Sequence, residues 1–117
     1  MKRIKIGIMS TKDVHKRIID IAAGRYVPKR GEPKVWFNSM KSLSEVLSDN
    51  NRELLKIIAD SAPENIQELA DITGRKASNL GRTLKTFEHY GFVKMIKRSR
   101  SKKPVVIATE FDIRMRA

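Results

Sequence analysis

Residues 63–104 read PENIQELADITGRKASNLGRTLKTFEHYGFVKMIKRSRSKKP, and this stretch carries the signals for two helices followed by a basic hairpin. Asn65 and Glu68 have the spacing of a capping box, which predicts a helix beginning just after Asn65. Gly74 lies where that helix would end, because glycine readily adopts the left-handed conformation that closes a helix and redirects the chain. A second helix is expected from about Lys76 to Tyr90. Two helices joined by such a short turn form a helix-turn-helix.

The second helix has an apolar stripe and an otherwise polar or positive surface. Leu80, Leu84 and Phe87 recur at helical spacing and are predicted to face the core. The first acidic residue is Glu88 in the last turn, although a negative charge is favourable near the N-terminus of a helix. This distribution is typical of a helix whose N-terminal half faces phosphate. The candidate contacts to base edges or phosphates are Arg75, Lys76, Ser78, Asn79, Arg82, Thr83, Lys85 and Thr86.

Three details of this helix have two interpretations each. Lys76 has no side-chain oxygen to cap the helix, so Ser78 would be the better cap if the helix began later, and the reading face would then shift. Gly81 in the helix interior costs about 1 kcal/mol relative to alanine. It either permits a close approach of the backbone to phosphate or is tolerated without a role. Asn79 and Arg82 could be solvated surface residues, but in this context we favour contact with nucleic acid.

A basic hairpin is predicted after the second helix. Two β-prone runs, residues 92–97 and 105–109, flank a polar, positively charged loop. Between residues 75 and 103, ten lysines and arginines stand against one acidic residue, Glu88. So dense a cluster of positive charge beside a helix of this type favours DNA binding. The alternatives are that these residues bind RNA or keep a flexible loop soluble. The candidate contacts on the hairpin are Lys97, Arg98, Arg100, Lys102 and Lys103.

The middle of the chain is acidic. Residues 39–71 contain three basic and seven acidic residues, so we expect this stretch to face away from DNA. One helix is predicted with its cap at Ser39 or Ser42. Another is expected to start at Asn50 or Asn51 and to run to Ser61, where Ala62-Pro63 closes it, because the residue before a proline is biased away from helical geometry. The predicted fold class is therefore α+β, mainly α: a winged helix-turn-helix with an N-terminal β-α extension.

The N-terminal segment is interpreted as a separate arm. Residues 2–9 alternate as a half-buried strand would, and Ser10 or Thr11 is expected to cap a helix that runs to about Gly24. Val35-Trp36-Phe37 is a second β-prone segment. The first strand must pair with this triplet, with the hairpin or with another chain. We therefore predict two domains: residues 1–37, for dimerisation or partner binding, and residues 38–117, for DNA binding.

The amino-acid composition excludes several other classes of protein and of site. A chain of 117 residues with net charge +12 suits one domain with an attached arm. It contains no cysteine, which excludes disulfides and thiolate metal sites. No signal peptide or long apolar run is present, so we expect a cytoplasmic protein that does not enter a membrane. Without a nucleophile motif, a glycine-rich phosphate loop or HExxH, we predict no enzyme, no catalytic residue, no cofactor and no metal site.

The segment IQELADITGRKASNLGRTLKTFEHYGFV resembles the core of bacterial and archaeal winged helix-turn-helix regulators of the MarR and ArsR type, over roughly Leu43 to Thr109. Over the whole chain the sequence looks most like the small predicted regulators called HVO_A0114-like, some of which lie beside toxin genes and look like antitoxins. The resemblance implies a recognition helix in the major groove and a wing against the minor groove or backbone. The residues it places there are Ser78, Asn79, Arg82 and Thr83 on the helix and Arg98, Arg100, Lys102 and Lys103 on the wing.

The expected function is therefore a sequence-specific regulator that binds double-stranded DNA as a homodimer and represses a promoter. The alternative is an antitoxin that neutralises a partner toxin through residues 1–37 and autoregulates its own promoter. A third possibility is an architectural or RNA-binding protein without an operator.

Overall fold

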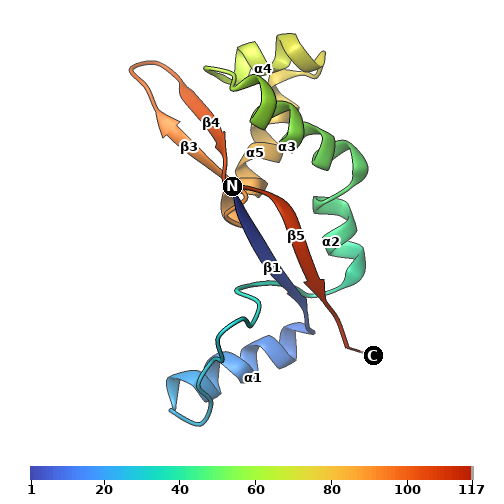
Figure 1. The fold of residues 1–117 in the computed structure, drawn as a ribbon, viewed down its shortest axis with the longest axis vertical. Coiled ribbons are helices and arrows are strands. Elements are labelled where there is room, and N and C mark those ends of the chain that lie inside the picture. The colour runs from blue at the N-terminus through green and yellow to red at the C-terminus, as the bar shows by residue number, and fades with distance from the viewer. Residues whose placement is uncertain (117) are drawn as a thin grey trace. The chain divides into compact units, whose positions relative to one another are not determined.

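A computed structural model describes residues 1–116 of the chain (Figure 1). The described residues form an α+β fold, as predicted. In chain order its elements are β1 (Lys2–Ile8), α1 (Thr11–Ala22), β2 (Val35–Phe37), α2 (Met40–Val46), α3 (Asp49–Ser61), α4 (Ile66–Thr73), α5 (Ala77–His89), β3 (Val93–Lys97), β4 (Lys102–Val106) and β5 (Ala108–Arg114). None of these helices is long and apolar enough to cross a lipid bilayer.

The chain divides into two compact units. One consists of Met1–Lys2 with Val46–Thr109 and is called the helical unit below. The other consists of Arg3–Glu45 with the residues from Glu110 onward and is called the sheet unit. We had predicted domains of residues 1–37 and 38–117. In the structure α2 up to Glu45 and most of β5 group with the N-terminal segment instead.

The helical unit is built on the apolar stripe predicted for its last helix. Leu80, Leu84 and Phe87 of α5 are 0%, 1% and 0% exposed, which confirms the predicted stripe. Full burial of such side chains stabilises a fold by about 1.5–3 kcal/mol each. Other buried apolar residues of this unit include Leu54, Leu55, Ile58, Leu69, Phe92, Val93 and Val106. This core holds α5 with one face fixed inward, so its polar residues are left on the outside.

Local capping sets the ends of the helices. The Asn65 side chain accepts a hydrogen bond from the Glu68 amide at 2.8 Å, and the Glu68 carboxylate accepts one from the Glu64 amide, one residue before the cap. Gly74 closes α4 with φ of 73°, as predicted. Helix α5 begins at Ala77 after Lys76, which makes no side-chain cap, so the later start at Ser78 is wrong.

Two further caps were predicted only approximately. Ser39 is the cap of α2, since its hydroxyl accepts from the Ser42 amide at 3.0 Å. The expectation that α3 starts at Asn50 or Asn51 is wrong by a residue or two. Ser48 caps this helix by accepting from the Asn51 amide at 3.2 Å, and α3 begins at Asp49. A serine hydroxyl reaches the free amide of the first turn as readily as an asparagine does.

The predicted hairpin is present, with a shorter loop and an earlier second strand. Strands β3 and β4 are antiparallel and pair from Val93 with Val106 to Lys97 with Lys102. The loop is therefore residues 98–101, whereas we had expected the second strand to begin at residue 105. Pro104 lies inside β4 opposite Met95. This is tolerated because β3 and β4 form a two-stranded sheet in which each strand has a free edge for the missing donor.

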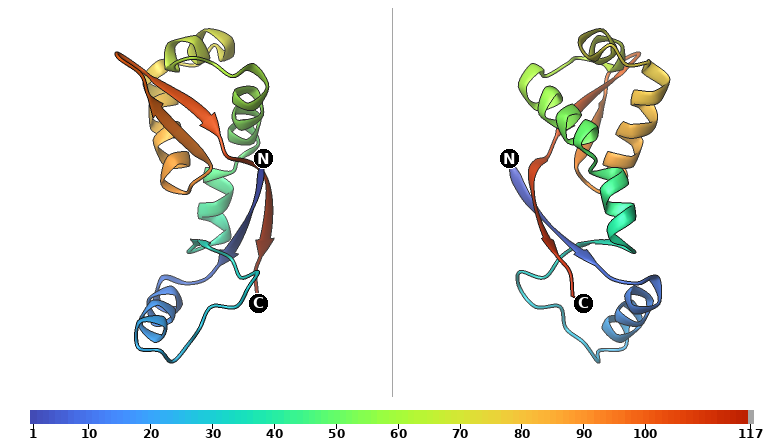
Figure 2. Two further views of the ribbon diagram at one scale, coloured as in Figure 1. Left: turned by 60° about the vertical axis from the view of Figure 1, so that its left-hand side comes forward. Right: turned by 90° about the vertical axis from the view of Figure 1, so that its right-hand side faces the viewer.

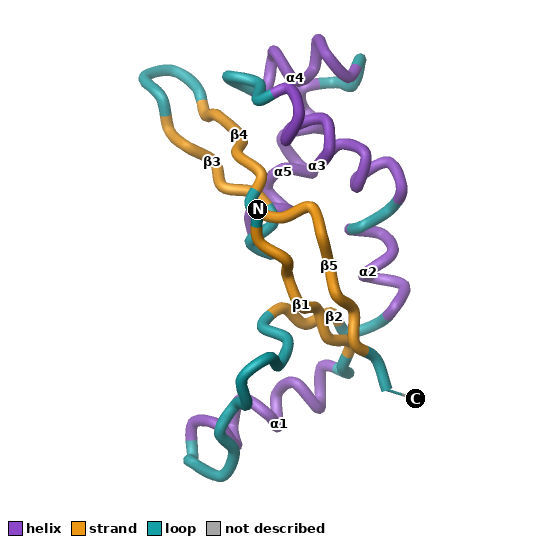
Figure 3. The backbone as a smooth tube through the Cα atoms, in the orientation of Figure 1, coloured by secondary structure: helices purple, strands orange, loops and turns teal. Residues whose placement is uncertain are grey.

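The sheet unit contains a three-stranded sheet in the order β2-β1-β5 (Figure 3). Strand β1 pairs in parallel with β2, with Gly7 beside Trp36, so of the three partners considered for this strand the triplet is one that it pairs with. A Cβ atom on Gly7 would lie 2.1 Å from Cζ3 of Trp36, so the indole ring covers this glycine. Ser10 caps α1 by accepting from the Asp13 amide at 3.2 Å.

Strand β5 was not predicted as a separate element. We had expected residues 105–109 to form one strand of the hairpin, but the pairing with β3 ends at Val106. The Ile107 amide then donates to the Phe92 carbonyl at 2.9 Å, and the chain continues from Ala108 into β5. Strands β1 and β5 run in the same direction (Figure 1).

Candidate nucleic-acid interface

The polar face of α5 is accessible along the whole helix. Because Leu80, Leu84 and Phe87 are buried, the remaining positions of the helix are turned outward. Thr83, between the two faces, is half-buried. The predicted contact residues that are exposed on α5 or at its N-cap are Lys76, Ser78, Asn79, Arg82, Lys85 and Thr86. Gly81 is half-buried, and a Cβ atom there would meet no atom within 4 Å.

Arg75 differs from the other predicted contacts of this helix. Its guanidinium Nη2 donates to the Asn50 carbonyl at 3.0 Å, and its amide donates to the Thr73 hydroxyl at 3.2 Å. It therefore fixes the turn between α4 and α5 to the start of α3. The Thr86 hydroxyl is also engaged, donating to the Arg82 carbonyl at 3.2 Å.

The predicted contact residues of the hairpin fall into two groups: four are exposed at its tip, and Lys103 forms an ion pair. Lys97, Arg98, Arg100 and Lys102 are exposed at its end. Lys103 is different, because its Nζ lies 2.9 Å from Oε1 of Glu64 and its side chain is only 20% exposed. The hydrogen bond from Lys103 holds the pKa of Glu64 below its usual value. Lys103 therefore ties β4 to the residues that precede α4, a role that the sequence alone did not indicate.

Apart from Lys103, the cations of this face form no close ion pair within residues 1–116. Within residues 1–116, no carboxylate lies within 4 Å of the charged groups of Lys76, Arg82, Lys85, Lys94, Lys97, Arg98, Arg100 and Lys102. Lys97 and Lys102 are direct cross-strand neighbours. Like charges directly opposite each other destabilise a strand pair. An anion placed between them would remove that cost.

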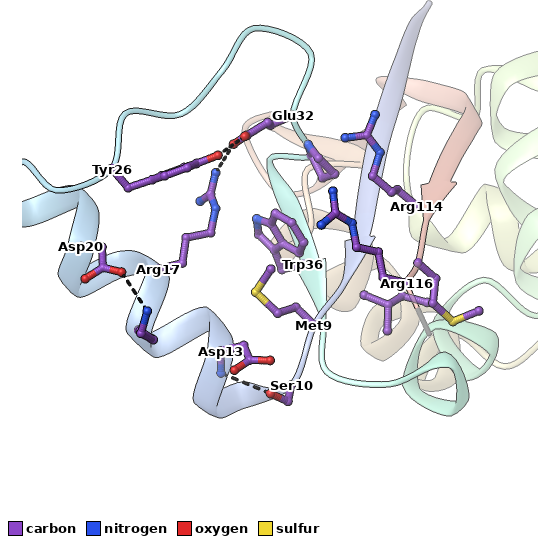
Figure 4. A pocket seen from close by; sticks show the side chains of 14 residues that line it. Met9, Ser10, Asp13, Arg17, Asp20, Tyr26, Glu32, Trp36, Arg114 and Arg116 are labelled. Carbon is purple, nitrogen blue, oxygen red and sulfur yellow. Dashed lines mark hydrogen bonds and ion pairs between the residues drawn. The ribbon is translucent and has the colours of Figure 1, made fainter.

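The second candidate site is a cleft in the sheet unit, which we did not foresee (Figure 4). Its volume is about 780 Å³. Arg17 on α1 lies 5.6 Å from the ring centre of Tyr26 and 5.2 Å from that of Trp36. Its guanidinium Nη2 contacts Oε2 of Glu32 at 2.7 Å, and the Tyr26 hydroxyl donates to the same carboxylate.

This cluster in the cleft is satisfied internally. The hydrogen bond from Tyr26, followed by that from Arg17, lowers the pKa of Glu32, and the same bond to Glu32 raises the pKa of Tyr26. The network therefore fastens the loop between α1 and β2 onto α1. Arg114 and Arg116 also line the cleft. Within residues 1–116, no group of three histidine or acidic side chains could hold a metal ion.

The family model of HVO_A0114 matches residues 46–113. The chain belongs to the HVO_A0114 family. The matched segment contains α3, α4, α5, the hairpin and most of β5, and leaves out β1, α1, β2 and all of α2 except Val46. No curated protein and no solved structure matches the chain. The segment matched by the HVO_A0114 family model thus includes every residue of the candidate nucleic-acid interface. The cleft, in contrast, is lined by residues outside the match.

Proposed function

We propose that this protein is a sequence-specific, double-stranded DNA-binding regulator that acts as a dimeric repressor. In this proposal the helical unit is a winged helix-turn-helix of the MarR and ArsR type, with α4 and α5 as the two helices and the β3–β4 hairpin as the wing. The observation that carries the proposal is the accessible row of unpaired cations and polar side chains along α5 and the hairpin tip. A surface that merely kept the protein soluble would have no need to exclude acidic partners.

Helix α5 supplies the side chains that read sequence in this proposal. Asn79 can pair in a bidentate manner with adenine, and Arg82 with guanine, in the major groove. Thr83 and Thr86 can contact thymine methyl groups or phosphates. Lys76 and Lys85 are available for the phosphates on either side of the groove. Each bidentate contact would discriminate against a wrong base by about 1–3 kcal/mol.

The hairpin supplies affinity rather than specificity. Lys97, Arg98, Arg100 and Lys102 at its tip would neutralise phosphates next to the site contacted by α5, and each neutralised phosphate releases condensed counterions. Arg75 and Lys103, which we first assigned to DNA contact, would instead hold α5 and the hairpin in position through Asn50 and Glu64. Repression would follow from occlusion of the promoter.

The direct test is selection of random duplex DNA on the purified protein. We expect a two-fold symmetric motif with half-sites about 10 base pairs apart, because two recognition helices of a dimer enter successive major grooves. Binding to the selected duplex should weaken steeply as salt is raised. A selection without a recovered motif, in which all duplexes bind alike, would contradict the proposal and leave only nonspecific attraction to DNA.

A second candidate is an antitoxin that neutralises a partner toxin through the N-terminal segment. Helix α1 favours it, because no residue of this helix is buried, and Ile18 and Ile19 are 57% and 52% exposed. Apolar side chains on an amphipathic helix fit a hydrophobic groove of another protein. Co-purification of a neighbouring gene's product should be lost in Ile18→Ser/Ile19→Ser and kept in Ile72→Ser, a control with similar exposure on α4. Equal retention by both variants would exclude α1 as the docking element.

A further inference from the structure

Among residues 1–116, no strand pairs with the outer edge of β5 in the three-stranded sheet. In the order β2-β1-β5, this strand pairs with β1 alone, and Figure 2 (left) shows β5 at the outer side of β1. Ile113 and Met115 at its end are 48% and 56% exposed. A long open edge with exposed apolar side chains is a template for pairing with another strand.

The sequence of this edge, taken with the two residues that follow β5, is self-complementary about Ile113. Residues 110–116 read EFDIRMR, with two acids before Ile113 and two arginines after it. We propose that a second copy of this chain pairs its β5 antiparallel with this β5, about a two-fold axis through Ile113. Asp112 would then face Arg114 of the other copy, and Glu110 would face Arg116. On the opposite face of the sheet, Ile113 would meet its own equivalent and Phe111 would meet Met115.

Neighbouring registers are less favourable, because directly opposed like charges destabilise a strand pair. An axis through Phe111 would set Glu110 against Asp112 of the other copy. An axis through Asp112 would oppose that residue to itself, and one through Arg114 would do the same to the arginine. Only the axis through Ile113 matches every charge of the segment with an opposite one.

Contacts within the chain fit this arrangement. Arg3 on β1 lies 2.9 Å from Glu110 and 3.9 Å from Asp112, so the acids are already flanked by a cation on their inner side. Arg114 and Arg116 have no carboxylate within 4 Å among residues 1–116 and can turn toward a partner. In the dimer the acids Glu110 and Asp112 would lie between Arg3 on β1 and the arginines Arg114 and Arg116 of the other copy.

This inference specifies the dimer of the proposed function, yet it does not depend on DNA and is tested without it. The chain has no cysteine, so a single introduced cysteine reports one contact. Directly opposed residues of an antiparallel pair have Cα atoms about 4.5–5.5 Å apart, within the range that a disulfide spans. Ile113→Cys should therefore cross-link to a covalent dimer under mild oxidation. Ile72→Cys is the matched control, because Ile72 is 47% exposed and Ile113 is 48% exposed.

At about 10 µM protein, an effective concentration near the millimolar range inside a dimer should make Ile113→Cys cross-link about a hundredfold faster than the control. Equal rates for the two variants would overturn the proposal. A wild-type chain that sediments as a monomer up to its highest soluble concentration would also overturn it.

Charge reversal gives a second, independent measurement. Asp112→Arg places arginine against arginine, and Arg114→Asp places acid against acid, so each variant alone should be monomeric where the wild type is dimeric. In an equimolar mixture the two variants become complementary, and a heterodimer should form. Thermal melts followed by circular dichroism check that each variant is folded, since Asp112 lies near Arg3. Folded variants that stay dimeric alone, or fail to associate when mixed, would contradict the register.

Discussion

Two regions of this protein are equally rich in basic residues but use them differently. Residues 2–34 contain ten lysines and arginines with three acidic residues, and residues 75–103 contain ten with one. In the first region four of the ten, namely Arg3, Lys16, Arg17 and Arg25, form ion pairs. In the second region only Lys103 forms an ion pair with a residue that the structure describes. From this comparison we propose that the cations held on α5 and the hairpin without a carboxylate partner, rather than positive charge as such, form the surface that binds an anion.

The largest effect is expected from removing the cations at the hairpin tip. The triple change Arg98→Ala/Arg100→Ala/Lys102→Ala should weaken binding to every duplex and reduce the slope of log K against log salt by about 3. The same charge can be removed from the first region with Lys12→Ala/Lys29→Ala/Arg30→Ala, which should leave the slope nearly unchanged. Fluorescence anisotropy across a salt series measures both. If the two triple variants change the salt slope equally, the total positive charge of the protein explains DNA binding, and the proposed difference between the two regions is wrong.

Arg82→Ala should weaken binding to the selected DNA sequence more than binding to DNA in general. We expect the selected duplex to lose about 1–3 kcal/mol of binding free energy, with a much smaller loss on random duplex, because only the base contact is removed. Competition binding of the two duplexes measures the difference. Equal losses on both would show that Arg82 touches only the backbone.

A smaller effect distinguishes two adjacent lysines. Lys102→Ala should lower the salt slope by about 1, as expected for one lost phosphate contact. Lys103→Ala should lower it less, because its Nζ already lies 2.9 Å from Glu64. The same salt titration serves for both variants. An equal change would mean that Lys103 leaves Glu64 when DNA binds.

The smallest effect concerns pH in the sheet unit. The pKa of Glu32 is lowered in the folded state, first by the Tyr26 hydroxyl and then by Arg17, so this group contributes stability above its unfolded pKa. That contribution is lost as pH falls through the lower, folded pKa. The melting temperature of the wild type should therefore drop more between neutral and acidic pH than that of Glu32→Gln, while DNA binding at neutral pH stays the same in both. Parallel pH profiles would show that the carboxylate is not held as the structure has it.

Local signals accounted for the features that were predicted correctly. The stripe of Leu80, Leu84 and Phe87 and the glycine end of α4 at Gly74 depend on residues within a few positions of each other, so periodicity and capping suffice. The pairing of β1 with residues 35–37 was foreseen as one of three options, because a lone strand needs a partner.

The features that were missed depend on contacts between distant residues. Lys103 meets Glu64, and Arg75 meets Asn50, only after the helices have packed, so both were assigned to DNA on charge alone. Strand β5 was taken for the end of the hairpin because residues 105–109 are continuously β-prone, and only the tertiary structure shows where pairing passes from β3 to β1. The roles of the exposed residues on α5 stay predictions.

The most direct test of the comparison is an NMR titration of the labelled protein with its selected duplex. We expect the largest amide shifts in α5 and at residues 97–102, and small shifts in α1 and around the cleft, where Lys16 and Arg17 are already paired with carboxylates. Largest shifts in α1 or the cleft, with α5 unaffected, would contradict the assignment of the nucleic-acid interface to the helical unit.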